Sequence, residues 1–136
     1  MQTVKLMKTI SLIIQISFYL FAGVNHFIKP EFYYPLIPDY LSDLKLQINI
    51  ISGLAEITLA VLLIPVKTRK IAGFGIILML IAFIPSHVYF ITADITSVGP
   101  LQVSPTMAWI RLLVIHPLLI FWAFSVSRQP AMEKTI

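Results

Sequence analysis

Long apolar runs separated by short polar breaks dominate the chain. Each run is close to the roughly 20 residues that an α-helix needs to cross a bilayer core about 30 Å thick. Four such runs occur, at 9–28, 46–66, 71–91 and 107–126. This pattern predicts an all-α fold in which four membrane-spanning helices form one bundle and a single domain, residues 1–136.

A cleaved signal peptide is the alternative for the first run, since Lys5 and Lys8 precede it. The run is long for the apolar region of a signal peptide and lacks a clear A-x-A cleavage site. It also ends in the polar and aromatic residues Asn25, His26 and Phe27. We therefore favour a retained first helix.

Basic residues are unevenly distributed among the breaks, and short cytoplasmic loops of membrane proteins are enriched in them. Seven fall before the first run, between the second and third, and after the fourth: Lys5, Lys8, Lys67, Arg69, Lys70, Arg128 and Lys134. The other two connections carry only Lys29 and Lys45, together with acidic residues. We predict that both termini are cytoplasmic. The short turn at 65–70 makes the second and third helices antiparallel neighbours.

The first outer connection, 29–45, is rich in proline, which interrupts regular helices, and in tyrosine, which prefers the headgroup level. Its proline and aromatic residues are Pro30, Phe32, Tyr33, Tyr34, Pro35, Pro38 and Tyr40. We expect this segment to form a lid on the outer membrane surface. The second outer connection, 92–106, is expected to be its irregular partner.

Composition agrees with a membrane location and excludes several functions. Of 136 residues, 58% are hydrophobic and 12% charged, against about 45–50% and 25% in soluble domains. The absence of cysteine excludes disulfides, thiolate nucleophiles and Fe–S ligation. The net charge of +4 is explained by basic residues flanking the spans, so nucleic acid is not an expected partner.

Polar residues inside the spans indicate the candidate site, because a charge at the bilayer centre costs at least about 2.5–3.5 kcal/mol. On the second helix a polar and small-residue stripe recurs at helical spacing: Asn49, Ser52, Gly53, Glu56 and Ala60. Small and polar side chains mediate helix association in lipid, so this stripe should face the bundle interior.

Most other polar residues lie toward the outer ends of the spans, which predicts one polar pocket that opens outward beneath the lid. A buried carboxylate is either neutral or paired with a cation. Arg111 is the only Lys or Arg inside the spans, so we expect a Glu56–Arg111 pair, bridged by His116 or His87. The candidate pocket residues are Asn25, His26, Ser52, Glu56, His87, Arg111 and His116.

Structural roles are the alternative for each of these residues. The Glu56–Arg111 pair is equally well explained as a tie between helices. The structural alternative for His26 is a hydrogen bond to loop backbone at the membrane surface instead of contact with a ligand. His116 precedes Pro117. Because proline has no N–H, one carbonyl in the preceding turn of the helix lacks a hydrogen-bond donor. The alternative role of the His116 ring is to donate to that carbonyl.

Metal and cofactor motifs give little further indication. Three histidines and Glu56 are chemically adequate metal ligands, but no two histidines have a recognised metal spacing, so no metal is predicted. A haem that the same histidines hold between two helices is a further alternative, although the depths predicted for these histidines in the membrane do not match. The sequence contains no phosphate-binding, dinucleotide-binding or nucleophile-elbow motif.

Short motifs follow one another in a fixed order along the four runs. They are Phe21-Ala22-Gly23-Val24-Asn25-His26-Phe27, Pro30, the Tyr34-Pro35-Leu36-Ile37-Pro38 run, Ser52-Gly53-Leu54-Ala55-Glu56, Pro65 with Arg69, Pro85, and Arg111 with Trp122. In this order the chain resembles the DoxX family of small four-helix membrane proteins. His116-Pro117 departs from the family, whose members often have a glutamine in that region.

The resemblance implies a bundle in a bacterial-type inner membrane that is associated with redox complexes. On this basis we expect a non-catalytic subunit or binding protein whose pocket takes a small amphipathic molecule, a quinone or a lipid. No resident cofactor is evident beyond the quinone candidate. Expected partners are membrane lipid and either a redox enzyme subunit or a second copy of the chain. The alternative is a membrane enzyme or proton-coupled carrier that uses Glu56 or His116 for proton transfer.

Overall fold

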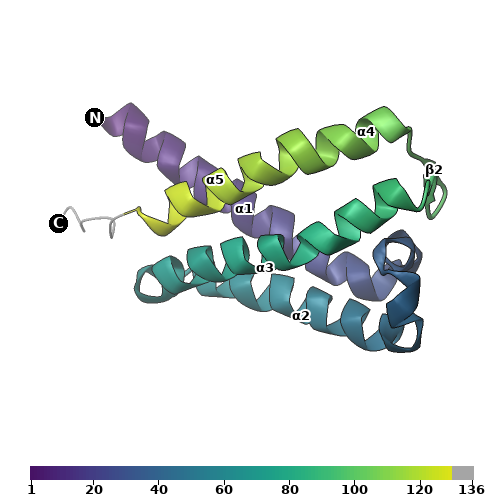
Figure 1. The fold of residues 1–136 in the computed structure, drawn as a ribbon. Helices are drawn as coiled ribbons and strands as arrows, with labels where there is room; N and C mark the ends of the chain where they lie inside the picture. The colour runs from purple at the N-terminus through teal and green to yellow at the C-terminus, as the bar shows by residue number, and fades with distance from the viewer. Residues whose placement is uncertain (130–136) are drawn as a thin grey trace.

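The computed structural model describes residues 1–129 and contains four long helical spans (Figure 1). Each is long and apolar enough to cross a membrane: Gln2–Ile28, Asp39–Leu63, Val66–Thr92 and Pro105–Ser127. Large apolar side chains on these spans are exposed, for example Phe21 (73%) and Phe121 (69%). The prediction of four helices long and apolar enough to cross a membrane, in a mainly helical fold, is confirmed. Lys134, one of the predicted cytoplasmic basic residues, lies outside the described residues.

Helices and short turns alternate along the chain. In order, the elements are α1 (Gln2–Ile28), the 3₁₀ helices η1 (Pro30–Phe32), η2 (Tyr34–Leu36) and η3 (Asp39–Leu44), α2 (Lys45–Leu63), α3 (Val66–Thr92), the strands β1 (Ser97–Val98) and β2 (Leu101–Gln102), α4 (Pro105–Ile110), the π-helical turn η4 (Arg111–Ile115), and α5 (His116–Ser127). The strands pair antiparallel in a small hairpin. Its turn contains Gly99 with a φ of +55°, a conformation that glycine adopts without strain.

The helices pack as a bundle in which α1 lies against α2, while α3 contacts both α2 and α5. The start of α1, the α2–α3 turn and the end of α5 lie at one end of the bundle (Figure 1). The η1–η3 segment and the β1–β2 hairpin lie at the other end. The two longer connections therefore share an end. Which side of the membrane this end faces stays a prediction.

The bounds of two helices differ from those that hydropathy predicts. The second helix is predicted to end at residue 66 and the third to begin at residue 71, whereas α2 ends at Leu63 and α3 begins at Val66. Pro65 is the N-cap of α3, and the side chain of Arg69 donates hydrogen bonds from Nε to the Leu63 oxygen and from Nη2 to the Ile64 oxygen, both 3.0 Å long. Because this side chain satisfies carbonyls at the end of α2, the basic segment forms the first turns of a helix instead of a loop.

Helix α1 begins at Gln2, not at residue 9 as predicted. The first eight residues of the chain are all exposed, so this part of α1 extends beyond the packed bundle. The packed part of α1 is tied to α5 by a hydrogen bond from Trp122 Nε1 to Ser11 Oγ of 2.8 Å.

Helices α1 and α2 cross at two glycines. A Cβ on Gly23 would lie 2.8 Å from the Gly53 oxygen, and a Cβ on Gly53 would lie 3.0 Å from the Gly23 oxygen. The two backbones therefore touch, as is typical of small-residue crossings in membrane bundles. His26 and Glu56 each follow their crossing glycine by three residues, which brings these two side chains to the same place in the bundle.

The predicted stripe on α2 faces the interior. Asn49, Gly53, Glu56 and Ala60 are buried, and Ser52 is half-buried. Two buried apolar clusters form the hydrophobic core. The first includes Leu63, Ile76 and Val126, and the second includes Phe90, Val98 and Ala108 beside the hairpin.

Candidate functional site

A cavity of about 1170 Å³ is lined by side chains from all four spans and from the η1–η3 segment. Most of its lining is apolar. Three of the lining residues, Ile51 and Leu54 on α2 and Leu78 on α3, are also 52–70% exposed. The cavity therefore reaches the apolar outer surface of α2 and α3. Of the seven predicted site residues, six line it: His26, Ser52, Glu56, His87, Arg111 and His116.

His26 is held at the cavity wall by Asn49. The Asn49 amide Nδ2 donates to the His26 backbone oxygen (2.8 Å), which orients the amide so that its Oδ1 faces the ring at 2.7 Å from Nδ1. Because Oδ1 only accepts hydrogen bonds, Nδ1 of His26 carries a proton. Asn49 lies on the predicted stripe of α2 but is not one of the predicted pocket residues. Its helical spacing from Glu56 is the sequence feature that indicates its place beside the site.

The other ring nitrogen of His26 faces Glu56, with 3.4 Å between Nε2 and Oε2. The contact is an ion pair when the imidazole is protonated. Both side chains are at most 8% exposed.

The predicted Glu56–Arg111 pair is wrong. Within residues 1–129, the ion pairs are His26–Glu56 and, at the surface, Lys45–Asp39. The close α1–α2 crossing supplies His26 as the partner of Glu56, so a cation from the fourth span is not required.

Tyr33, between η1 and η2, covers His26. The two rings stack with centroids 3.5 Å apart and an interplanar angle of 19°. The Tyr33 hydroxyl donates to the Ala22 oxygen (2.9 Å) and accepts from Asn25 Nδ2 (3.3 Å). Burial raises the pKa of Tyr33, and the Asn25 hydrogen bond opposes that shift in part, so the hydroxyl stays a donor at neutral pH. Asn25, the one candidate that does not line the cavity, positions Tyr33.

A second polar cluster comes from α3 and the fourth span. The Arg111 guanidinium lies over the buried Phe90 ring, 4.6 Å from its centroid, a favourable cation–π arrangement. Its Nε and Nη2 are buried and have no hydrogen-bond partner in the described part of the chain. Arg111 begins the π-helical turn, whose hydrogen bond runs from the His116 N–H to the Arg111 oxygen. This bond sets Arg111 and His116 one turn apart on the same side of the span.

His116 bridges the fourth span to α3. Its Nε2 donates to the Leu80 oxygen at 2.6 Å, a carbonyl on α3 and not the one that Pro117 leaves free in its own helix. The His87 ring lies edge-on to His116, with centroids 4.8 Å apart, and the buried His87 Nδ1 lacks a hydrogen-bond partner among residues 1–129. The same residues contain no group of three or more His, Cys, Asp or Glu side chains that could hold a metal ion.

The electrostatics of the two clusters differ. Glu56 has His26 as its ion-pair partner, whereas Arg111 faces an aromatic ring and has no anionic partner within the described residues. The cavity therefore combines an apolar interior with one uncompensated cation and a neighbouring pair of histidines.

Comparison with known proteins identifies the family of the chain. Residues 16–127 match a family described as a domain of unknown function, DUF8561, and the chain belongs to this family. The matched range includes every polar residue of the cavity. No curated protein and no solved structure matches the sequence.

Proposed function

We propose that this protein is an integral membrane protein whose cavity binds a small amphipathic molecule, a quinone or a lipid, without catalysing a reaction by itself. One observation carries the proposal. Arg111 Nε and Nη2, His87 Nδ1 and Glu56 Oε2 are buried without hydrogen-bond partners in the described structure, and all three residues line a large, mainly apolar cavity. Buried polar groups are normally satisfied. A ligand with a polar end would satisfy these.

The chemistry of Arg111 selects the polar end of the ligand. A guanidinium only donates hydrogen bonds, and an unpaired cation in a membrane is unfavourable. The matching group is an acceptor, such as the carbonyl oxygen of a quinone or an oxygen of a lipid headgroup. The apolar tail would lie along the α2 and α3 side of the cavity, whose volume of about 1170 Å³ slightly exceeds the range of about 300–1,000 Å³ that is usual for small-molecule sites.

The exposed lining residues support entry from the bilayer. Ile51, Leu54 and Leu78 connect the cavity with the apolar surface of α2 and α3, a route open to a molecule dissolved in lipid. In this proposal the opening that was expected to face outward is closed by the lid, where Tyr33 stacks on His26. The lid then stays in place while the ligand moves laterally.

The partner and the location follow from the resemblance to the DoxX family. A subunit that binds a quinone would deliver it to, or hold it for, a redox enzyme in the same membrane. The absence of cysteine favours a partner that supplies the electron-transfer groups. We accordingly propose a bacterial inner-membrane location and a redox-associated complex or a homo-oligomer.

Binding of decylubiquinone by the full chain in mild detergent tests the proposal. Wild-type protein should bind the probe, and Arg111→Gln should weaken binding about tenfold or more, because hydrogen bonds from charged groups contribute about 1.5–3 kcal/mol. Lys67→Gln is the control for loss of a positive charge, since Lys67 is exposed and lines neither this cavity nor any other described pocket. Mass spectrometry of molecules that co-purify with the wild type distinguishes a quinone from a lipid. Failure of the wild type to bind the probe or to retain any amphipathic molecule would refute the proposal, as would unchanged binding by Arg111→Gln.

Proton transfer is the second candidate function, and the His26–Glu56 contact favours it. The imidazole Nε2 of His26 and the carboxylate Oε2 of Glu56 lie 3.4 Å apart at the wall of the cavity, and two adjacent titratable groups inside a span are the arrangement that a proton relay needs. His116 is a weaker candidate because its Nε2 proton is already donated to Leu80. If Glu56→Gln keeps its fold and its ligand but loses proton-coupled transport or turnover in vesicles, this function gains support. If Glu56→Gln only destabilises the bundle, the residue is structural.

A further inference from the structure

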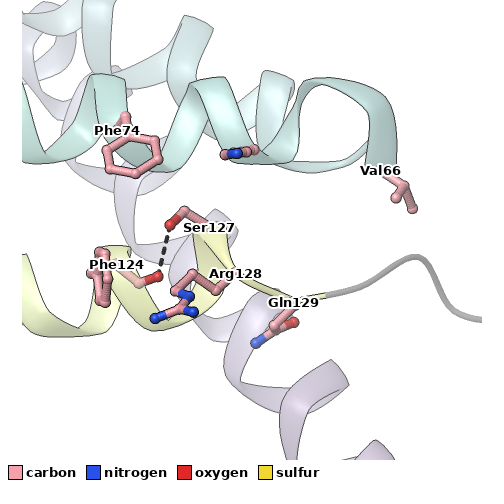
Figure 2. A pocket seen from close by; sticks show the side chains of 7 residues that line it. Val66, Phe74, Phe124, Ser127, Arg128 and Gln129 are labelled. Atoms are coloured by element: carbon pink, nitrogen blue, oxygen red, sulfur yellow. Dashed lines mark hydrogen bonds between the residues drawn. The ribbon is translucent and has the colours of Figure 1, made fainter.

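A separate pocket of about 500 Å³ lies at the end of the bundle that carries the α2–α3 turn. Its walls come from the start of α3 and the end of α5 (Figure 2). The lining residues are Val66, Lys70, Phe74, Phe124, Ser127, Arg128 and Gln129. None of them lines the large cavity, so this pocket is independent of the function proposed above.

The width of the pocket is fixed by close packing of α3 against α5. A Cβ on Gly73 would overlap the Cβ of Ser127, so the two helices touch directly beside the pocket. Phe74 and Phe124 then meet edge to face with centroids 6.4 Å apart. Both rings are 39–47% exposed. They form an apolar wall that extends from the pocket toward the middle of the span.

The charge at the mouth of the pocket is positive. Lys70 and Arg128 line it from the two helices and are both exposed. The Arg128 guanidinium lies over the Phe124 ring, 5.4 Å from its centroid, which holds the cation beside the apolar wall. Among residues 1–129 the acidic side chains lie elsewhere: Glu31, Asp39, Asp43 and Asp94 in the connections at the opposite end, and Glu56 inside α2. No described carboxylate is therefore available to neutralise these two cations.

We propose that this pocket binds an anionic phospholipid, with the headgroup phosphate between Lys70 and Arg128 and the start of the acyl chains on Phe74 and Phe124. The cations lie toward the end of the bundle, and each aromatic ring lies four residues, about one helical turn, further into the span. This order matches the order of groups in a phospholipid. Basic pockets between helices at a membrane surface are typical sites for anionic headgroups. A soluble phosphate would use the cations but leave the aromatic wall exposed.

Native mass spectrometry of the full chain with phosphatidylglycerol and with phosphatidylcholine of the same acyl chains tests the proposal. Wild-type protein should retain phosphatidylglycerol in preference to phosphatidylcholine. Each basic side chain near a membrane surface contributes about 1 kcal/mol, or about fivefold, so Lys70→Gln with Arg128→Gln should weaken retention about 25-fold. Lys5→Gln with Lys8→Gln removes the same charge from exposed positions at the same end and should change retention less than twofold.

Several results would overturn the proposal. They are equal retention of the two lipids by the wild type, full retention by the Lys70 and Arg128 double variant, or an equal loss in the Lys5 and Lys8 control. Competition by glycerol 1-phosphate at the same concentration as the lipid would identify a soluble-phosphate site instead. If the double variant does not fold, Arg128→Gln alone should lose about fivefold, and retention at the wild-type level would refute the site.

Discussion

Replacing Gly53 with alanine should force α1 and α2 apart. The added Cβ would lie 2.7 Å from the His26 Cβ, 2.9 Å from the Phe27 ring and 3.0 Å from the Gly23 oxygen. Carbon atoms pack at about 3.5–4.0 Å, so the contact with His26 is short by about 1 Å. Neither a β-carbon nor a backbone oxygen moves independently of its helix. The two helices must therefore separate at their crossing.

The expected loss of stability combines two opposing effects. Overpacking costs about 1–3 kcal/mol, while alanine is favoured over glycine inside a helix by about 0.8–1.0 kcal/mol. Gly53→Ala should therefore lower the free energy of unfolding by up to about 2 kcal/mol, with a central value of about 1 kcal/mol. Gly75 is the matched control, because a Cβ there would meet Leu59 Cδ2 at 2.5 Å but the next atoms only at 3.7 Å. A leucine methyl group can rotate away, so Gly75→Ala should be neutral or stabilising by up to about 1 kcal/mol.

Unfolding in mixed detergent micelles, followed by helical circular dichroism, measures both variants against the wild type. The difference of about 2 kcal/mol between Gly53→Ala and Gly75→Ala is the quantity that the α1–α2 crossing determines. Equal free energies of unfolding for the two variants would mean that the helices do not touch at Gly53. A stabilised Gly53→Ala variant would contradict the crossing outright.

Two further predictions use the same unfolding assay. In a double-mutant cycle, His26→Ala and Glu56→Gln should show a coupling energy of about 1 kcal/mol. The effects of Glu56→Gln and Arg111→Gln on the free energy of unfolding should add within about 0.5 kcal/mol, because these two side chains lack a shared contact. The reverse result would restore the Glu56–Arg111 pair. Arg69→Gln should destabilise the protein by about 2–4 kcal/mol, since it removes two charge-assisted hydrogen bonds to carbonyls at the end of α2. The exposed Lys67→Gln should change stability by less than about 0.5 kcal/mol, and equal effects of these two substitutions would exclude a capping role for Arg69.

Hydropathy was sufficient to find the spans because a segment in lipid must satisfy its backbone hydrogen bonds internally, which leaves long apolar helices. It was not sufficient to find where α2 ends. A cluster of basic residues is typical of a loop, and Arg69 contributes to that pattern. The side chain of Arg69 instead returns to the α2 carbonyls and makes the segment helical. Such a hydrogen bond depends on three-dimensional position, which composition does not encode.

The candidate residues were largely found from their polarity, but their partners were not. The rarity of polar groups in spans indicated six of the residues that line the cavity. The partner of Glu56 was inferred from formal charge, which selects Arg111 and overlooks His26. The Gly23–Gly53 crossing brings His26 to Glu56. This crossing depends on how two helices pack, which the spacing of residues along one helix does not reveal.

The π-helical turn explains how one span contributes both Arg111 and His116 to the cavity. In a regular α-helix residues five apart differ by about 140° in direction, so one of the two would face lipid. The hydrogen bond from the His116 N–H to the Arg111 oxygen places them on one side instead. Pro117 favours this distortion because it has no N–H with which to continue the α-helical pattern. π-helical turns frequently occur at functional sites. Here the turn keeps a cation out of lipid and directs it into a cavity where the described residues offer it only an aromatic face, which is the arrangement expected if the ligand supplies the acceptor.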